Sequence, residues 1–289
     1  MRRLLVLLVL GITIGSLYFF IAPKLKTSFL PPDILKPQFA IISPSPTPPV
    51  TRKFAVMSDI HNDLASLQKA LFKAKEDNVS FVIIAGDLTN TGQTKELTDI
   101  KKVLEQSGLK YYVIPGNHDF WATHNLKTNL IDPIFGPEFT SFKEGTTKFI
   151  LISNGSYLWG INGVVSAAGQ KQGDWLKNEL KECPQTTCLV FAHMPLNHPD
   201  SSHIMGEGSA KITKEAQDYE KLFVKSQVYE LFAGHLHFHS DYEFKGLKTI
   251  VTGAITSERN LQRPRFLEVL ISNSPNTPPI YQQIVLSDL

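Results

Sequence analysis

The sequence lacks an excess of charge of either sign. Its 289 residues include 29 lysines and arginines against 27 aspartates and glutamates, which gives a formal net charge of +2. Because no run of five or more basic residues occurs, we find no signature of nucleic-acid binding. The charge balance identifies neither the substrate nor the oligomeric state.

Cysteine is scarce as well. Cys183 and Cys188 are the only two, with four residues between them. In an oxidising compartment they could close a small loop, provided that their Cα atoms approach within ~7 Å. The alternative is a pair of reduced thiols at the ends of neighbouring elements, and the sequence leaves both open.

The N-terminus joins two arginines to a long apolar run. Residues 4–22 carry no charge, and ~20 apolar residues suffice for a helix to cross a bilayer. A removable signal has a shorter apolar region of ~7–15 residues, so residues 1–23 are predicted to be an uncleaved, single-pass anchor in the cell membrane. Arg2 and Arg3 favour a cytoplasmic start, although two lysines beyond the run weaken the asymmetry. We expect the rest of the chain outside the cytoplasm, or secreted if the segment is cleaved.

A segment rich in proline, serine and threonine follows, over residues 24–51. Its prolines lock φ and remove amide donors, which favours an extended, semi-rigid linker. The remaining residues, 52–289, are enough for one domain with its own core.

The first part of this domain alternates strands and helices. Strands are predicted near residues 53–58, 81–85 and 111–114, and helices near 64–75 and 95–106. The first helix should start after Asp63 as N-cap and place Leu64, Leu67, Leu71 and Phe72 on one buried face. Such β-α-β units imply parallel strands with right-handed crossovers.

The second part contains fewer helices. We predict helices near 174–181 and 214–225, and strands near 148–153, 157–161, 188–192 and 229–233. Strands at 249–252, 266–271 and 280–286 should form a second, mixed or antiparallel sheet packed on the first.

Residue types that bind metals follow the predicted strands. Asp59 and His61 are two residues apart, so their side chains project to the same side of an extended segment. Gly86-Asp87 follows the second strand, and one carboxylate can bridge cations ~3.5–4 Å apart. Taken alone, either aspartate is equally typical of a turn or a helix cap.

The third strand is followed by Asn117, His118 and Asp119. Asn117 offers a neutral amide oxygen as a ligand, and His118 an imidazole that could give a proton to a departing alkoxide. Asp119 is placed either to orient His118 or to cap a helix.

Three more histidines complete the series. His193 ends an apolar run, where a lone histidine would otherwise belong to the edge of the core. His235 and His237 flank Leu236 after the next apolar run and share one side of the chain. Since open α/β sheets bind ligands beyond the carboxyl ends of their strands, the five motifs predict a single site.

In this order the motifs resemble the pattern of the calcineurin-like metallophosphoesterase family, D-x-H, G-D, G-N-H-[D/E], H and G-H-x-H, over residues 54–237. The resemblance implies an α/β (α+β) fold, a four-layer αββα sandwich of two mixed β-sheets flanked by helices. Here an N-terminal transmembrane helix would precede it. The resemblance also implies that the protein is a dinuclear, metal-dependent phosphoesterase or phosphodiesterase.

The resemblance assigns a role to each motif residue. One divalent ion would be held by Asp59, His61 and His237, the other by Asn117, His193 and His235, with Asp87 bridging them. A metal-bridging hydroxide would attack phosphorus, and His118, supported by Asp119, would protonate the leaving oxygen. Purple acid phosphatases carry a tyrosine ligand where this chain has Asn90, so Mn²⁺, Fe²⁺ or Zn²⁺ is expected rather than a tyrosinate-bound ferric ion.

Two alternatives stay open. The chain could be a non-catalytic, membrane-tethered binding or scaffold protein that keeps this fold, or the enzyme could face the cytoplasm.

The other histidines are expected in solvated loops, and His198 is the best candidate among them to line the cleft. They are His124, His198, His203 and His239. Arg259 is expected at the surface, with contact to a substrate phosphate as its alternative.

Overall fold

The computed structural model describes residues 51–123, 130–273 and 277–286. The predicted anchor and the linker up to residue 50 lie outside these ranges. Within them, every helix is too short or too polar to cross a membrane. The described residues belong to one compact unit, Pro48–Leu289.

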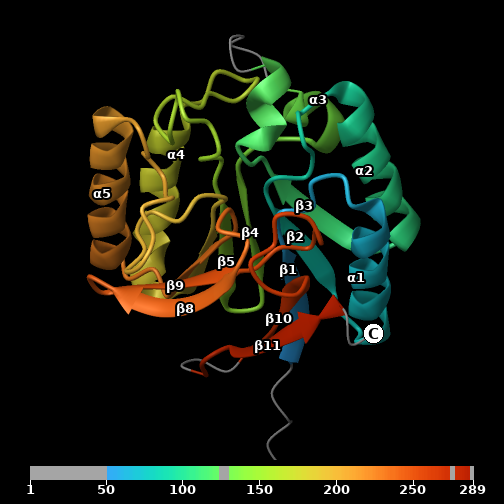
Figure 1. The fold of residues 1–289 in the computed structure, drawn as a ribbon. Helices are drawn as coiled ribbons and strands as arrows, with labels where there is room; N and C mark the ends of the chain where they lie inside the picture. Colours follow the sequence, from blue (N-terminus) through green and yellow to red (C-terminus); the bar gives the residue numbers. More distant parts are fainter. Residues whose placement is uncertain (1–50, 124–129, 274–276, 287–289) are drawn as a thin grey trace, which may run out of the picture. The chain divides into compact units, whose positions relative to one another are not determined.

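The first sheet has the strand order β11-β10-β1-β2-β3 (Figure 1). Strands β1, β2 and β3 are parallel, while β10 pairs antiparallel with β1 and with β11. Helices α1 and α2 connect the parallel strands, as the sequence predicts. The bounds are β1 Thr51–Met57, α1 Leu64–Glu76, β2 Phe81–Ala85, α2 Thr94–Ser107, β3 Lys110–Ile114, β10 Arg265–Ser272 and β11 Ile280–Val285.

The second sheet has the order β4-β5-β6-β7-β9-β8 and is also mixed. Strands β5, β6, β7 and β9 are parallel, and the edge strands β4 and β8 pair antiparallel. The bounds are β4 Thr140–Glu144, β5 Thr147–Leu151, α4 Gln172–Glu179, β6 Thr187–Phe191, α5 Ala210–Lys225, β7 Glu230–Ala233, β8 His239–Phe244 and β9 Leu247–Thr252. Short helices are η1 His118–Thr123, α3 Ile131–Phe135 and η2 Leu180–Gln185.

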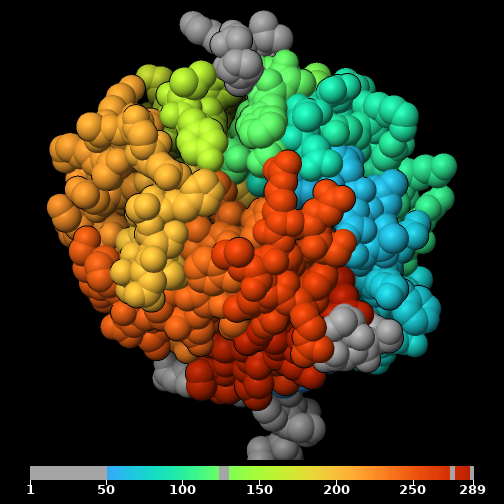
Figure 2. Space-filling model, viewed as in Figure 1, coloured from blue at the N-terminus to red at the C-terminus, as the bar shows by residue number. Residues whose placement is uncertain are grey.

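Three apolar layers join these elements. One lies between α1, α2 and the first sheet, another between α4, α5 and the second sheet, and the third between the two sheets. The helices therefore cover the outer faces of two stacked sheets (Figure 1). In Figure 2 the red C-terminal part of the chain lies beside the blue N-terminal part, as the pairing of β10 with β1 requires.

Aromatic rings dominate the layer between the sheets. Phe54 on β1 stacks on Phe81 with centroids 5.3 Å apart, and the edge of Phe149 on β5 meets it at 5.1 Å. Phe191 and Phe232 on the next two strands lie 6.1 and 6.5 Å from Phe54. Phe54 thus contacts both sheets and has no exposed surface.

Helix α1 begins as predicted, because the Asp63 side chain accepts a hydrogen bond from the Ser66 amide. The predicted buried face is wrong at Phe72, which is 65% exposed. The buried positions are Leu67, Ala70, Leu71 and Ala74, which follow the i, i+3, i+4, i+7 spacing of one helix face. Phe72 is the residue after Leu71, so the turn of the helix carries its side chain out of this face.

The predicted strand at 157–161 is wrong, because these residues form turns. The Ser156 hydroxyl accepts hydrogen bonds from the amides of Leu158 and Trp159, and Gly160 has a φ of 58°. Local side-chain bonding of this kind competes with a strand ladder.

The assignment of the last strands to the second sheet is correct only for β9. β10 and β11 extend the first sheet instead, so the chain returns to its starting sheet. The prediction also missed β4 and β8. β8 is joined to β9 by Lys245-Gly246, both with positive φ, a two-residue hairpin turn.

The structure pairs the two cysteines. Cys183 and Cys188 form a disulfide with their Cα atoms 5.3 Å apart, the first of the two alternatives that the sequence left open. The bond joins η2 to β6 and closes a loop of a few residues.

Replacing Phe54 tests the layer between the sheets. Phe54→Ala should lower the free energy of unfolding by about 3–5 kcal/mol, because it leaves a cavity among rings from both sheets. Phe72→Ala, the same change at an exposed position, should cost less than about 0.5 kcal/mol. Chemical denaturation of both variants measures the difference, and equal losses would contradict this account of the core.

Candidate metal centre

Five strand ends meet at one edge of the two sheets. The candidate ligands occupy the first residues beyond them: Asp59 and His61 after β1, Asp87 after β2, Asn117 after β3, His193 after β6, and His235 and His237 after β7. Six of these seven are less than 9% exposed, and the His237 side chain is 14% exposed. The structure thus brings together every residue that the sequence proposed as a ligand.

The backbone at these positions adopts a strained conformation. Asp59, His61, Asp87, His235 and His237 all have φ between 49° and 72°, in the left-handed region that costs a residue with a Cβ roughly 1–2 kcal/mol. Such strain persists only where the surroundings enforce it, and it clusters at functional sites.

Backbone hydrogen bonds between loops enforce this geometry. The Asp59 amide donates to the carbonyl of Gly86 at 3.1 Å, and the amides of Ile60 and His61 both donate to the carbonyl of Asp87, at 2.8 and 3.1 Å. The loops after β1 and β2 are therefore joined directly, which fixes the ligands of the first motif relative to those of the second.

The first group of donors comprises Asp59, His61, Asp87 and His237, whose ligand atoms all lie within 4.8 Å of one another. The Nε2 atoms of His61 and His237 are 3.1 Å apart. His61 Nε2 is 3.5 Å from Asp87 Oδ2, and His237 Nε2 is 3.5 Å from Asp59 Oδ1. Two imidazoles and two carboxylates facing one point suit a divalent transition metal.

The second group comprises Asp87, His193 and His235. His193 Nε2 lies 3.4 Å from Asp87 Oδ1 and 3.0 Å from Asn117 Oδ1. The Asn117 oxygen therefore joins this group, although its neutral amide is not a titratable ligand. Asp87 thus presents Oδ2 to one group and Oδ1 to the other, the arrangement of a bridging carboxylate.

Outer contacts orient two of the imidazoles. His193 Nδ1 is 2.9 Å from the carbonyl of Ala85, and His237 Nδ1 is 3.1 Å from the carbonyl of Arg259. Each contact leaves Nε2 directed at the centre, as in most histidine metal sites. The Arg259 backbone, rather than its side chain, makes this contact.

A buried atom of His235 tests whether the site fits a cation. Its Nε2 is buried and has no hydrogen-bond partner among the described residues. Leaving such an atom unpaired is unfavourable, and a bound cation would satisfy it. The donor set of carboxylates, imidazoles and one amide is therefore positioned for two divalent metal ions.

Burial and charge set the protonation of the site. Burial lowers the pKa of His61 to about 4 and that of His235 well below its usual value, which keeps both imidazoles neutral. Burial also disfavours charge on His193 and Asp87, but their mutual attraction is stronger. This attraction raises the pKa of His193 to about 9 and holds the pKa of Asp87 below its usual range. A metal ion at the second group would displace the proton of His193.

His118 lies beside the first group. Its ring meets the edge of His61 at a centroid distance of 4.7 Å and stacks on Trp121 at 4.0 Å. Its Nδ1 is 2.8 Å from the carbonyl of Asn90. The Asn90 carbonyl therefore orients this imidazole, a role that the position of Asn90 in the sequence did not indicate.

Asp119 has a different environment from the one expected for a partner of His118. Its carboxylate accepts hydrogen bonds from the amides of Leu88, Thr89 and Gly116 and from the Thr89 hydroxyl. Burial and the charge of Asp87 raise the pKa of Asp119 to about 7. These contacts join the loops after β2 and β3, which favours a structural role over an orienting one.

Two residues at the site were not predicted from the sequence. Asn154 follows β5 and accepts hydrogen bonds from the amides of His193 and Met194, so it holds the strand end that carries His193. The ring of His203 stacks on His235 with centroids 4.1 Å apart. The position of Asn154 after a strand end was an available signal; nothing local distinguished His203.

His198, the histidine that the sequence favoured for the cleft, instead contacts the Ser240 hydroxyl at 3.1 Å. His239 is the first residue of β8, and His124 lies outside the described residues.

The chain is similar in sequence to proteins named as phosphodiesterases. The chain is 28% identical over 194 residues to a protein of Arcobacter nitrofigilis named "Probable glycerophosphodiester phosphodiesterase GpdQ", covering 62% of this chain and 64% of that protein. It is 29% identical over 164 residues to a 3',5'-cyclic-nucleotide phosphodiesterase of Nostoc sp., covering 55% and 56%. The matches thus span about three fifths of the length of these relatives.

A solved structure shows the same fold. A dimetal phosphatase from Danio rerio superposes with a TM-score of 0.54 at 14% identity, covering 82% of this chain and 99% of that one. The family model described as calcineurin-like phosphoesterase matches residues 52–239, a range that begins in β1 and ends just after the last candidate ligand. The chain therefore belongs to the calcineurin-like phosphoesterase family.

Proposed function

We propose that this protein is a membrane-anchored, metal-dependent phosphoesterase that hydrolyses a phosphodiester or phosphomonoester. The observation that carries the proposal is the position of Asp87, whose two oxygens face two separate groups of metal-ligand atoms. Family membership and the names of the two relatives support the same reaction class, and both relatives are named for diesters.

The side chains of this site have distinct tasks in such a reaction. Two divalent cations, when bound, would polarise the phosphoryl oxygens and lower the pKa of a water molecule towards about 7. Asp87 lies between the two groups, the carbonyls of Ala85 and Arg259 orient the imidazoles of His193 and His237, and the Asn154 side chain holds the backbone of His193. A phosphoester would therefore meet groups that are already in position.

His118 is the group that would protonate the leaving oxygen. It is partly exposed, lies against His61 of the first group, and has one nitrogen directed at the Asn90 carbonyl. If Nδ1 donates to that carbonyl, Nε2 is left for the substrate. Because the Asn90 carbonyl fixes the ring, proton transfer would need no movement of the backbone.

The proposed location is the cell membrane, with the phosphoesterase domain outside the cytoplasm. The apolar residues 4–22, preceded by Arg2 and Arg3, support an anchor with a cytoplasmic N-terminus. The disulfide between Cys183 and Cys188 supports an oxidising compartment, since cytosolic thiols are kept reduced.

The alternative is a binding or scaffold protein that keeps the fold without the reaction. It predicts that metals bind while phosphoesters are not hydrolysed. The complete set of donors and the partly exposed His118 favour the enzyme, because a protein without catalysis would need neither.

Removing Asp87 should abolish metal binding and activity together. Asp87→Ala takes away the side chain that both groups share, so the purified full-length protein should lose both metal ions and hydrolysis of bis-p-nitrophenyl phosphate. Asp99→Ala, at an exposed ion pair on α2, is the matched control and should retain both. Metal analysis with assays after Mn²⁺, Zn²⁺ or Fe²⁺ loading decides. Full activity of Asp87→Ala would refute the proposed site. A metal-loaded wild-type protein that does not hydrolyse the substrate would favour the binding or scaffold alternative.

Removing His118 should separate binding from turnover. His118→Ala should keep the metal content and lower kcat by about 10²–10⁴, the usual scale of a general acid. Asp99→Ala, at the exposed ion pair on α2, serves again as the control and should leave kcat unchanged. Wild-type turnover by His118→Ala would rule out the role assigned to this residue.

Topology can be tested in intact cells. If the domain lies outside the cytoplasm, protease added externally should degrade it, and a C-terminal tag should disappear from the cell fraction. Protection of the tag until the cells are lysed would place the domain in the cytoplasm instead. A cytosolic marker protein, which must stay intact, shows that the cells were not leaking.

A further inference from the structure

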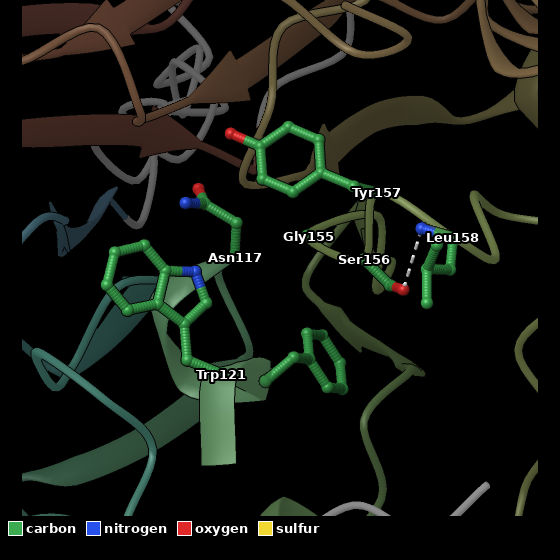
Figure 3. A pocket seen from close by; sticks show the side chains of 7 residues that line it. Asn117, Trp121, Gly155, Ser156, Tyr157 and Leu158 are labelled. Atoms are coloured by element: carbon green, nitrogen blue, oxygen red, sulfur yellow. Dashed lines mark hydrogen bonds between the residues drawn. The ribbon is translucent and has the colours of Figure 1, made fainter. Parts of the chain in front are cut away.

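An apolar cavity adjoins the candidate metal centre. It has a volume of about 460 Å³ and is lined by Phe120 and Trp121 of η1 and by Tyr157 and Leu158 of the turns after β5. Asn117, which faces the second metal group, lines the same cavity. Figure 3 shows the rings of Trp121 and Tyr157 reaching into this space from two different segments of the chain.

The lining residues expose large apolar surfaces. Trp121 is 48% exposed, Tyr157 39% and Leu158 60%. Apolar side chains gathered around a hollow next to polar, convergent groups are typical of a ligand site. A cavity of this size holds one ring system with its immediate substituents rather than a macromolecule.

Trp121 connects the cavity to His118, the proposed proton donor. The Trp121 ring stacks on His118 with centroids 4.0 Å apart and an interplanar angle of 30°. A phosphoester with its leaving oxygen at His118 would direct the group beyond that oxygen along the face of Trp121. The cavity is therefore placed for the leaving group, not for the phosphate.

The wall opposite Trp121 is held firmly. Nδ2 of the Asn154 side chain donates to the carbonyl of Met194 at 2.7 Å, and the Glu215 carboxylate accepts from the backbone amides of Ile161 and Asn162 at 2.6 and 2.8 Å. Gly155 packs so closely on the backbone of Gly116 that a Cβ there would clash. Tyr157 and Leu158 thus sit on a turn that is fixed at both ends, so the cavity exists before a ligand arrives.

We propose that this cavity binds a planar aromatic leaving group of the phosphoester substrate, such as an aryl or nucleobase-sized ring, between Trp121 and Tyr157. The inference rests on the proposed function and narrows its substrate class. Aromatic rings from two segments favour a flat ring over an aliphatic chain, because stacked or edge-to-face contact adds to the burial of apolar surface. Stacking of a base on an aromatic side chain is sequence-tolerant and substantial.

Phosphonates test the cavity without turnover. Benzylphosphonate, cyclohexylmethylphosphonate and methylphosphonate share the metal-binding group and differ in what they offer the cavity. For the Mn²⁺-loaded full-length protein, calorimetry should show benzylphosphonate binding about tenfold more tightly than methylphosphonate, and more tightly than the cyclohexyl ligand. Trp121→Ala and Tyr157→Leu should each reduce the preference for benzylphosphonate to about twofold or less, with the affinity for methylphosphonate unchanged.

Controls separate the cavity from the reaction. Trp121→Phe should restore most of the aromatic preference, and Phe72→Ala, an exposed aromatic on α1, should leave it intact. Equal affinities for the benzyl and cyclohexyl ligands, an unchanged preference in both cavity variants, or binding of neither ligand would overturn the proposal. Hydrolysis of bis-p-nitrophenyl phosphate by the same preparation reports separately on the proposed function, so the two can fail independently.

Discussion

The carboxylate of Asp87 is the point on which the site depends. Its Oδ2 faces His61, its Oδ1 faces His193, and Oδ1 also accepts a hydrogen bond from the His118 amide at 2.9 Å. One buried side chain thus links the loops after β1, β3 and β6. Its negative charge also raises the pKa of His193 and of Asp119, so the protonation of the neighbouring groups follows from its position.

The approach of these loops explains the glycines in the motifs. A Cβ at Gly86 would clash with the His193 ring, one at Gly116 with the Asp87 carboxylate, and one at Gly234 with the Ser58 hydroxyl. Each glycine therefore leaves the space that a ligand of another motif, or its neighbour, occupies. The spacing of glycine and ligand along the sequence reflects contacts between different strands, which is why the motifs appear as a set.

Strand ends and buried runs could be predicted from sequence because their causes are local. Hydrophobic runs gave β2 and β6 to within a residue or two, and the ligands followed where those runs stopped. The rest depended on distant partners. β10 joins the first sheet because it pairs with β1, more than two hundred residues away, and Asp119 turns to amides of Leu88 and Thr89 rather than to its neighbour His118. No local pattern encodes either choice.

The incorrect strand at 157–161 shows how the cavity and the metal centre are coupled. A run of aromatic and branched residues there satisfies a strand pattern, yet Ser156 bonds to its own turn and Gly155 packs against Gly116. That close packing sets the turn against the backbone that carries Asn117, a residue shared by the second metal group and the cavity. The turn that carries one wall of the cavity and the strand end that carries a candidate metal ligand are therefore packed directly against each other, through the backbones of Gly155 and Gly116.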